Sequence, residues 1–447
     1  MRYISNTAAQ QREMLATIGV ASIEDLLAGI PPKARLSRPL ALPAAMAEMD
    51  LVRHLRGLAG RNAGADEFAC FLGAGAYDHA IPSPINHLVS RGEFFTAYTP
   101  YQPEASQGTL RSIFEYQTMM AELTGMDVAN ASIYDGASSL AEAALMAHAV
   151  TGREQILLSR GVNPLYRQVV ETYCEGPALR LRSIPLGDGT TDLDALRKAV
   201  SERTAAVVVQ YPNFFGCLED VRAAGEIAHA AGALLVVVAD PVNLGLLTPP
   251  GALGADVVVG EGQGLGVPMS FGGPNLGVFA ARQDLVRRMP GRLVGATVDR
   301  DGQRGFVLTL QTREQHIRRE KATSNICTNV ALCALMATIY VAIMGKHGLR
   351  RVGGLSTAKA HYAAGELARI PGVRLRFGAP FFKEFTLELP KVPERVVKRL
   401  LRDRILAGVP LKPFDRTLKN CLLVAVTEQR TRGEIDAFAA ALGRAVA

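Results

Sequence analysis

Short apolar runs alternate with amphipathic stretches through the middle of the chain. The apolar runs are rich in β-branched residues and predict strands at 155–159, 179–185, 205–210, 233–239, 256–259 and 276–280. The intervening stretches repeat apolar positions at helical spacing and predict helices at 110–124, 139–150, 164–174, 193–201 and 221–231. Continuously apolar strands separated by helices indicate a mostly parallel sheet covered on both faces, so this part belongs to the α/β class.

Different patterns precede and follow this α/β segment. Before residue 62 the pattern favours helices and connectors, with Ser22 capping a helix that carries Asp25 in its first turn. Residues 68–107 combine glycine, proline and aromatic residues without periodicity, which predicts ordered loops packed on another surface. The more charged end of the chain predicts a smaller α+β domain with strands and helices at 385–389, 393–406, 421–426 and 433–442.

One long apolar run spans residues 330–344 and is shorter than the ~20 residues that a membrane-spanning helix needs. Its composition predicts a buried helix at a domain or subunit interface, with Thr328 and Asn329 as capping candidates. We therefore expect an N-terminal helical extension with interface loops, a large α/β domain, and an interface helix with the small C-terminal domain. Their expected bounds are 1–108, 109–328 and 329–447.

Composition narrows the classes of function. The chain has 447 residues, 48% of them hydrophobic, and a formal net charge of +7, as in an ordinary soluble protein. No basic run is long enough for a nucleic-acid-binding arm. The six cysteines form no CxxC pair and lack a histidine at zinc spacing, which favours reduced thiols over a metal site. The N-terminal residues lack the apolar core of a signal peptide, so we expect a cytoplasmic protein.

Two segments carry candidate chemistry. Asp240 follows the apolar run 233–239 and is expected at the carboxyl end of a buried strand, where open α/β sheets bind ligands. Residues 136–139, of sequence Gly-Ala-Ser-Ser, precede a predicted helix, whose N-terminus suits a phosphate. Taken alone, an ordinary N-cap by Ser138 or Ser139 is the simpler interpretation. The Gly-Gly-Pro at 272–274 predicts a turn in either case.

In this order, the phosphate-type turn, the strand-end acid and the Gly/Pro-rich segment resemble the aminotransferase-type (fold-type-I) pyridoxal-phosphate enzymes. Such enzymes need a lysine for the Schiff base, yet no lysine lies between Lys198 and Lys321. Longer strings resemble the glycine decarboxylase (P-protein) family of the glycine cleavage system over essentially the whole chain. They are residues 73–79, 95–104, 106–108 and 319–328.

That family exists as one long chain of two similar halves or as two subunits, and this length fits the first half, the α subunit of the split form. The resemblance implies that pyridoxal phosphate is bound in the partner β subunit. It places Gln263 at the Schiff-base lysine position and Arg160 at the position of a histidine. Gln263 is an amide and forms no imine. We therefore expect a degenerate cofactor site made of Ser138, Arg160, Asp240, Asn243 and Gln263.

The family's reaction joins glycine to pyridoxal phosphate, releases CO2 and passes the aminomethyl group to the lipoyl arm of the H carrier protein. The resemblance implies that the isolated chain is inactive and that its partners are the β subunit and the lipoylated carrier. A paired heterodimer and a heterotetramer both fit. The modest positive charge would suit an acidic partner.

Residues outside the degenerate site are candidates for the wall of the partner's active site or its lipoyl channel. They are Tyr98, Tyr101, Glu104, Lys321, Ser324 and Asn325. A role in packing the subunit interface is an equally weighted alternative for them. Two further readings of the whole chain stay open: a stand-alone enzyme of this fold that uses Lys198 or Lys321, and a regulatory pseudoenzyme with another partner.

Overall fold

The structure is a computed structural model that describes residues 5–36 and 38–447. The chain forms two compact units, residues 1–63 and 64–447. The first unit contains α1 (Ala8–Ile18), α2 (Ile23–Leu26) and α3 (Glu48–Ala59). Ser22 and Asp25 form the predicted cap, since the Ser22 hydroxyl accepts from the Asp25 N–H and Asp25 accepts from the Ser22 N–H. None of these three helices contains a buried side chain.

The second unit is built on a sheet of seven strands in the order β2-β8-β7-β6-β5-β3-β4. Their bounds are β2 Val128–Ala129, β3 Gln155–Ser159, β4 Arg180–Ile184, β5 Thr204–Tyr211, β6 Leu234–Ala239, β7 Val257–Glu261 and β8 Gly277–Ala281. The strands from β7 to β4 are parallel, and β8 runs antiparallel to both β7 and β2. Each predicted strand matches an observed one to within two residues, which confirms the α/β class.

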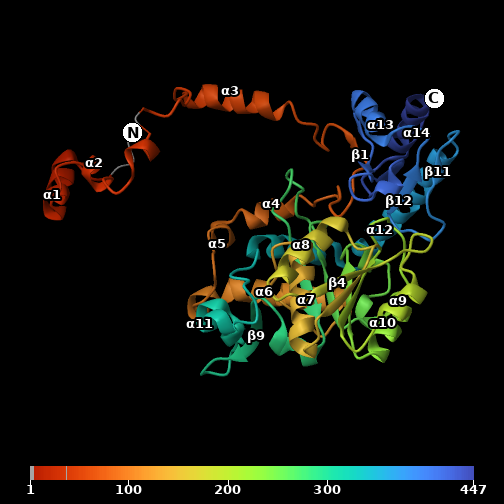
Figure 1. Ribbon diagram of the computed structural model, residues 1–447, viewed down its shortest axis with the longest axis horizontal. Helices are drawn as coiled ribbons and strands as arrows, with labels where there is room; N and C mark the ends of the chain where they lie inside the picture. The colour runs from red at the N-terminus through yellow and green to blue at the C-terminus, as the bar shows by residue number, and fades with distance from the viewer. Residues whose placement is uncertain (1–4, 37) are drawn as a thin grey trace. The chain divides into compact units, whose positions relative to one another are not determined.

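Helices cover both faces of this sheet (Figure 1). They are α6 Pro103–Thr124, α7 Gly136–Thr151, α8 Pro164–Glu175, α9 Leu193–Ala199, α10 Val221–Ala230 and α12 Ala331–Ala368. Successive residues of a strand pack into separate hydrophobic cores, because their side chains point alternately to the two faces of the sheet. Val207 belongs to the core under α6, α10 and α12, whereas Val208 belongs to the core under α7 and α8. Two apolar faces explain why the inner strands β5, β6 and β7 are apolar along most of their length.

The interface helix predicted at 330–344 is the first part of α12. Within the described residues, α12 is the helix whose length and hydropathy would also allow a membrane span. Its backbone breaks at Gly345 (φ 56°, ψ −178°), and its first part contributes Cys333, Leu335 and Tyr340 to the core. Thr328 and Asn329 do not cap it, because both side chains instead accept hydrogen bonds from Arg292.

The end of the chain forms a four-stranded antiparallel sheet in the order β11-β12-β15-β14. These strands and the helices packed with them are β11 Arg374–Leu375, β12 Glu384–Glu388, β14 Val409–Pro410, β15 Cys421–Ala425, α13 Pro393–Leu400 and α14 Arg432–Val446. The helix predicted at 393–406 ends early, at Leu400. Arg404 adopts a left-handed conformation, and the next residues form β13 (Ile405–Leu406), which pairs with β1 (Ala69–Cys70).

The loops predicted at 68–107 contain only β1 and the short helices α4 (Pro84–Val89) and α5 (Gly92–Phe95) before α6 begins at Pro103. A hairpin of β9 (Leu293–Val298) and β10 (Arg304–Thr309) was not predicted. It packs with α6, and the remaining short helix is α11 (Gln315–Arg318). The domain bounds at 108 and 328 stay predictions.

Candidate functional site: a closed cofactor-type pocket

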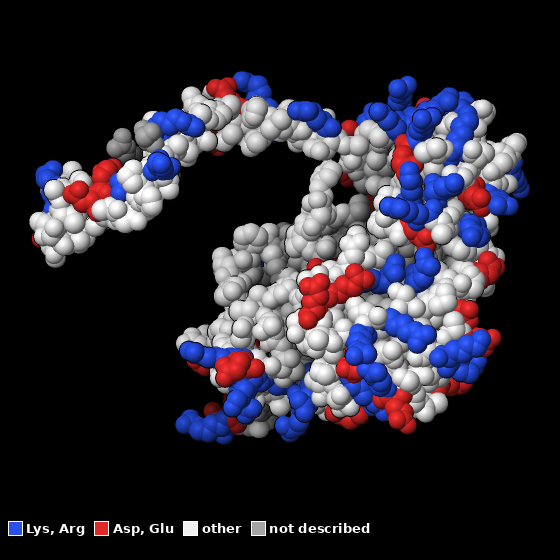
Figure 2. Space-filling view, viewed as in Figure 1, with Lys and Arg blue, Asp and Glu red and all other residues white. Residues whose placement is uncertain are grey.

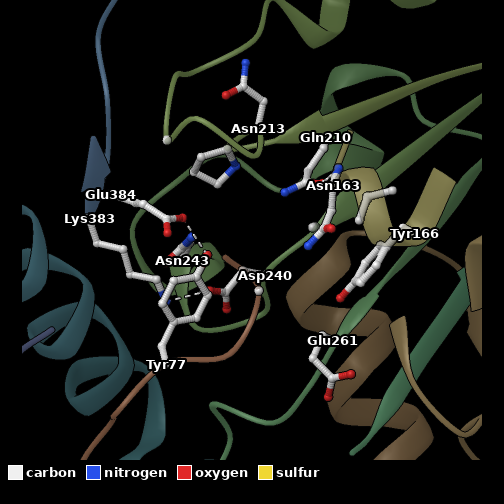
Figure 3. A pocket seen from close by; sticks show the side chains of 15 residues that line it. Tyr77, Asn163, Tyr166, Gln210, Asn213, Asp240, Asn243, Glu261, Lys383 and Glu384 are labelled. Carbon is white, nitrogen blue, oxygen red and sulfur yellow. Dashed lines mark hydrogen bonds and ion pairs between the residues drawn. The ribbon is translucent and has the colours of Figure 1, made fainter. Parts of the chain in front are cut away.

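Asp240 follows β6 at the carboxyl edge of the sheet, where it faces β12 of the C-terminal sheet (Figure 3). Its Oδ2 lies 2.6 Å from the Nζ of Lys383, a side chain that is only 2% exposed. The Lys383 ammonium also lies 3.7 Å from the centre of the Tyr77 ring. A buried ammonium needs such partners, because burying an unpaired charge costs roughly several kcal/mol of folding free energy. Sequence analysis did not single out Lys383.

A chain of hydrogen bonds continues from Lys383. Its Nζ lies 2.9 Å from Nε2 of His79, and His79 Nδ1 lies 2.7 Å from Oε2 of Glu428. Since an ammonium only donates, Nε2 accepts and the imidazole proton lies on Nδ1, facing Glu428. Burial disfavours the Glu428 carboxylate, but hydrogen bonds from His79 and Ala80 hold its pKa below the ordinary value. The network therefore places one cation between two carboxylates.

Glu384, the first residue of β12, closes another side of the pocket. Its Oε1 accepts from the Ala74 N–H at 2.7 Å, and its Oε2 accepts from the Tyr77 hydroxyl at 2.8 Å. Burial raises the pKa of Glu384 to about 7, against the effect of these hydrogen bonds and of Lys383. The segment 73–79, one of the strings that carry the family resemblance in the sequence, is thus bound to the C-terminal sheet.

The N-terminus of α7 is also occupied by carboxylates. Asp135 is the N-cap and accepts from the Ser138 N–H at 2.7 Å, so neither serine expected there caps the helix. Glu261, at the end of β7, accepts from the Gly136 N–H at 3.1 Å through Oε2. Its Oε1 accepts from the N–H groups of Gln263 and Leu276, each at 2.9 Å. Burial raises the pKa of Glu261 to about 7, and the three N–H donors oppose that rise.

Gln263 is buried and fully engaged by the backbone. Its Nε2 donates to the Val267 carbonyl at 2.7 Å, and its Oε1 accepts from the Tyr77 N–H at 3.0 Å. The amide therefore holds the turn after β7 against segment 73–79. Asn243 lies with Asp240 on the pocket wall, and its Oδ1 is buried without a hydrogen-bond partner.

Two members of the expected site lie elsewhere. The Ser138 side chain donates to the Asp135 carbonyl and so belongs to the N-cap hydrogen bonds of α7. Arg160 is paired with Asp415 at 2.5 Å and lines a neighbouring cavity of about 170 Å³ with Arg167 and Phe214. The structure thus brings Asp240 and Asn243 together, places Gln263 just behind them, and directs Arg160 away.

The two lysines proposed from the sequence, Lys198 and Lys321, do not line this pocket. Lys198 is exposed on α9, and Lys321 is exposed in the turn before residues 322–330. Lys383 could not be singled out because it lies 143 residues from Asp240 and just before a strand of another sheet. The local signal was a pair of charged residues, Lys383 and Glu384, at the beginning of a strand whose next residues are mostly buried.

A second cluster joins part of the region expected near a partner. The buried Arg292 donates to the Tyr101 hydroxyl at 3.0 Å, to the Cys327 carbonyl at 2.7 Å and to Thr328 Oγ1 at 2.9 Å. Ser324 Oγ accepts from the Ile326 N–H at 3.0 Å. Of the residues expected near a partner, Ser324 is half-buried, and the exposed ones are Tyr98, Tyr101, Glu104, Lys321 and Asn325.

A largely parallel α/β sheet, with an acid after its central strand and a helix N-terminus at the same edge, defines a protein of the fold-type-I pyridoxal-phosphate class. A glutamate decarboxylase from Lactobacillus brevis shares this fold, with a TM-score of 0.69 and 14% identity over 93% of this chain and 95% of that one.

The sequence model of the glycine cleavage system P-protein family matches residues 1–442. A Moorella thermoacetica protein named "Probable glycine dehydrogenase (decarboxylating) subunit 1" is 56% identical over 442 residues, which cover 99% of each chain. A crystal structure of glycine decarboxylase (P-protein) of the glycine cleavage system, in inhibitor-bound form, is 48% identical with a TM-score of 0.90, covering 100% of both chains. The chain belongs to the glycine cleavage system P-protein family.

The residues of the pocket do not fit pyridoxal phosphate. Gln263, which the family resemblance places at the Schiff-base position, is an amide held by backbone hydrogen bonds, and Asp240 is already paired with Lys383. The pocket holds a cavity of about 30 Å³. By comparison, a cavity that takes a benzene ring has a volume of roughly 150 Å³. No step of the family's reaction is assigned to this pocket.

Proposed function

We propose that this chain is the α subunit of a glycine decarboxylase and that the pyridoxal phosphate of the complex is bound by a partner β subunit. The observation that carries this proposal is the Asp240–Lys383 ion pair, which uses the acid that would otherwise hold the cofactor's ring nitrogen. The full-length relative named subunit 1 supports a division of the enzyme between two chains. The complex would decarboxylate glycine and transfer the aminomethyl group to the lipoyl arm of the H carrier protein.

The exposed surface around Arg292 is our candidate for contact with the β subunit's active site. Tyr98 is 79% exposed and Tyr101 is 48% exposed, beside segment 321–328. Exposed aromatic side chains on ordered loops are typical of interfaces that bury them. Arg292 fixes Tyr101 and Thr328 in one arrangement, which a surface that shapes a neighbouring active site requires.

Substitution of Tyr98 and Glu104 distinguishes a wall of the partner's active site from simple interface packing. Tyr98→Ala and Glu104→Gln are compared with wild type for glycine decarboxylation and for complex mass in solution. Lost turnover in an intact complex would support the wall. Unchanged turnover would leave these residues no part in it.

The basic face of the C-terminal domain is the candidate contact for an acidic carrier protein. Figure 2 shows lysine and arginine side chains gathered over α13, α14 and β11. The exposed residues along α13 and just before it include Lys391, Arg395, Lys398 and Arg399. Such a concentration of one charge raises the rate of encounter with a partner of opposite charge. We place the complex in the cytoplasm, where a thiol-containing chain of this kind stays reduced.

The test is a titration of the purified chain with pyridoxal phosphate, followed by borohydride reduction, peptide mapping and a glycine decarboxylation assay. We expect no site-specific Schiff base on this chain, and decarboxylation only after the β subunit is added. A saturable label on one lysine of this chain, with activity in the absence of the β subunit, would overturn the proposal.

A further inference from the structure

We propose that Lys383 and Glu261 are built-in substitutes for the two charged ends of the lost cofactor. The Lys383 ammonium pairs with Asp240 as a protonated ring nitrogen would. The Glu261 carboxylate accepts a hydrogen bond at the N-terminus of α7 as a phosphate would. Figure 3 shows the two side chains on either side of Asp240. This inference concerns the chain's own residues and holds whichever partner it assembles with.

The cationic end rests on the surroundings of Lys383. Its Nζ pairs with Asp240 at 2.6 Å, lies 2.9 Å from His79 Nε2 and lies over the Tyr77 ring at 3.7 Å. A positive charge over an aromatic face, with an acid at one side, is itself a cation-binding arrangement. In this chain the cation belongs to Lys383, the residue just before β12, so Asp240 keeps a partner without any ligand.

The anionic end rests on the donors around Glu261. The carboxylate accepts from Gly136, at the first turn of α7, and from the two backbone N–H groups of Gln263 and Leu276. A helix N-terminus and convergent N–H groups are the usual setting for a bound phosphate. Gly136 admits no side chain here, since a Cβ would lie 2.6 Å from the Tyr166 hydroxyl oxygen. Backbone groups that would have needed an anion therefore already have one.

The middle of the site is closed by the same elements. Gln263 bonds the Val267 carbonyl and the Tyr77 N–H, and Tyr77 in turn donates to Glu384. An amide at position 263 is thus accompanied by internal charged partners at both ends of the site. It follows that a lysine restored at position 263 alone would not restore cofactor binding, because the charges at both ends are still satisfied internally.

The test compares two variants of the full chain, Gln263→Lys and the triple variant Gln263→Lys/Lys383→Ala/Glu261→Ala. Each is titrated with pyridoxal phosphate, reduced with borohydride and mapped. An imine forms when the lysine amine condenses with the cofactor aldehyde and loses water, and borohydride reduces that imine to a stable amine. Exposed Lys198 and Lys321 report non-specific labelling in the same sample. We expect no saturable label at position 263 in the single variant and a saturable label there in the triple variant.

A saturable label at position 263 in the single variant overturns the inference, and so does its absence in a folded triple variant. If the triple variant does not fold, a double-mutant cycle on the otherwise wild-type chain decides. Lys383→Met should lower the denaturant midpoint, and adding Asp240→Asn should recover a large part of that loss. Losses that simply add would show that Lys383 is not the partner that Asp240 requires.

Discussion

At the scale of single residues, this pocket is defined by ionisable side chains that have found partners within the chain. Lys383 forms an ion pair with Asp240, and Glu261 accepts a hydrogen bond from the first turn of α7. Glu384 accepts a hydrogen bond from segment 73–79. Buried charge is expensive unless it is paired and hydrogen bonded, so each of these groups constrains its neighbours. The same feature makes the stability of the chain depend on pH.

Glu384 should make the folded chain less stable as the pH rises from about 4.5 to about 7. Its folded pKa is raised to about 7 by burial, above the value of 4.5 for a free side chain. Below pH 4.5 both states are protonated and its contribution is complete. Between these values the folded state binds more protons than the unfolded state, so about 3 kcal/mol of stability is lost with rising pH.

The variant Glu384→Gln should remove this part of the pH dependence. The amide still accepts from Ala74, and its NH2 group can donate to the Tyr77 oxygen, because a hydroxyl both donates and accepts. Urea unfolding at pH 5 and pH 8 measures the effect, with the exposed Glu394→Gln as control. A pH dependence equal to that of wild type would show that Glu384 is not the responsible group.

Gly216 should tolerate no side chain. It has φ +88°, and a Cβ there would lie 1.7 Å from the Glu384 carbonyl oxygen, a backbone atom that cannot turn away. Gly216→Ala should cost about 3 kcal/mol or more, measured by chemical denaturation. The control is Gly254→Ala, because Gly254 has φ +99° and open space around it, so only the left-handed strain of about 1 kcal/mol remains. Equal losses of unfolding free energy in the two variants would show that the clash with the Glu384 carbonyl is not the cause of the destabilisation.

At the scale of helices and strands, the sequence predicts the large sheet well because two apolar faces make its inner parallel strands nearly continuous apolar runs. Observed β3 matches its predicted bounds, and β5 differs by one residue at each end. The hairpin β9–β10 was missed, since half of β9 is exposed and the buried residues of β10 are separated by half-buried ones, so neither strand forms a continuously buried run. The pocket was half predicted: Asp240 follows a visible strand, whereas Lys383 reaches it only through tertiary folding.

We expect the helix α13 to affect binding of the lipoylated carrier through its positive charge and not through the stability of the fold. We expect Arg395→Glu/Arg399→Glu to raise the KM for the lipoylated carrier roughly tenfold at low ionic strength, with a smaller effect at high salt. Both side chains are exposed beside the buried Val396, so the helix should keep its packing. The α9 variant Arg197→Glu/Lys198→Glu makes the same change in net charge elsewhere on the surface. If both variants raise the KM equally, the effect is one of net charge and not of α13.

At the scale of the whole molecule, the first unit exposes apolar side chains that a soluble complex has to cover. On α3, Val52 and Leu55 lie on the same side of the helix and are 40% and 53% exposed. Contiguous exposed apolar residues mark surfaces for association. We propose that a β subunit covers this face, since the name "subunit 1" of the Moorella thermoacetica relative implies a second chain.

Val52→Asp/Leu55→Asp should therefore weaken assembly with the β subunit. Burying a valine and a leucine side chain contributes about 1.5–3 kcal/mol each, so the dissociation constant should rise roughly a hundredfold or more. Sedimentation of mixtures at several concentrations measures it. Arg53→Asp, on the opposite side of α3, is the matched control, because it lowers the net charge by the same two units without removing a valine or leucine side chain. If the double variant and the control assemble equally well, α3 does not belong to the interface, and the exposed loops around Tyr98 must carry it instead.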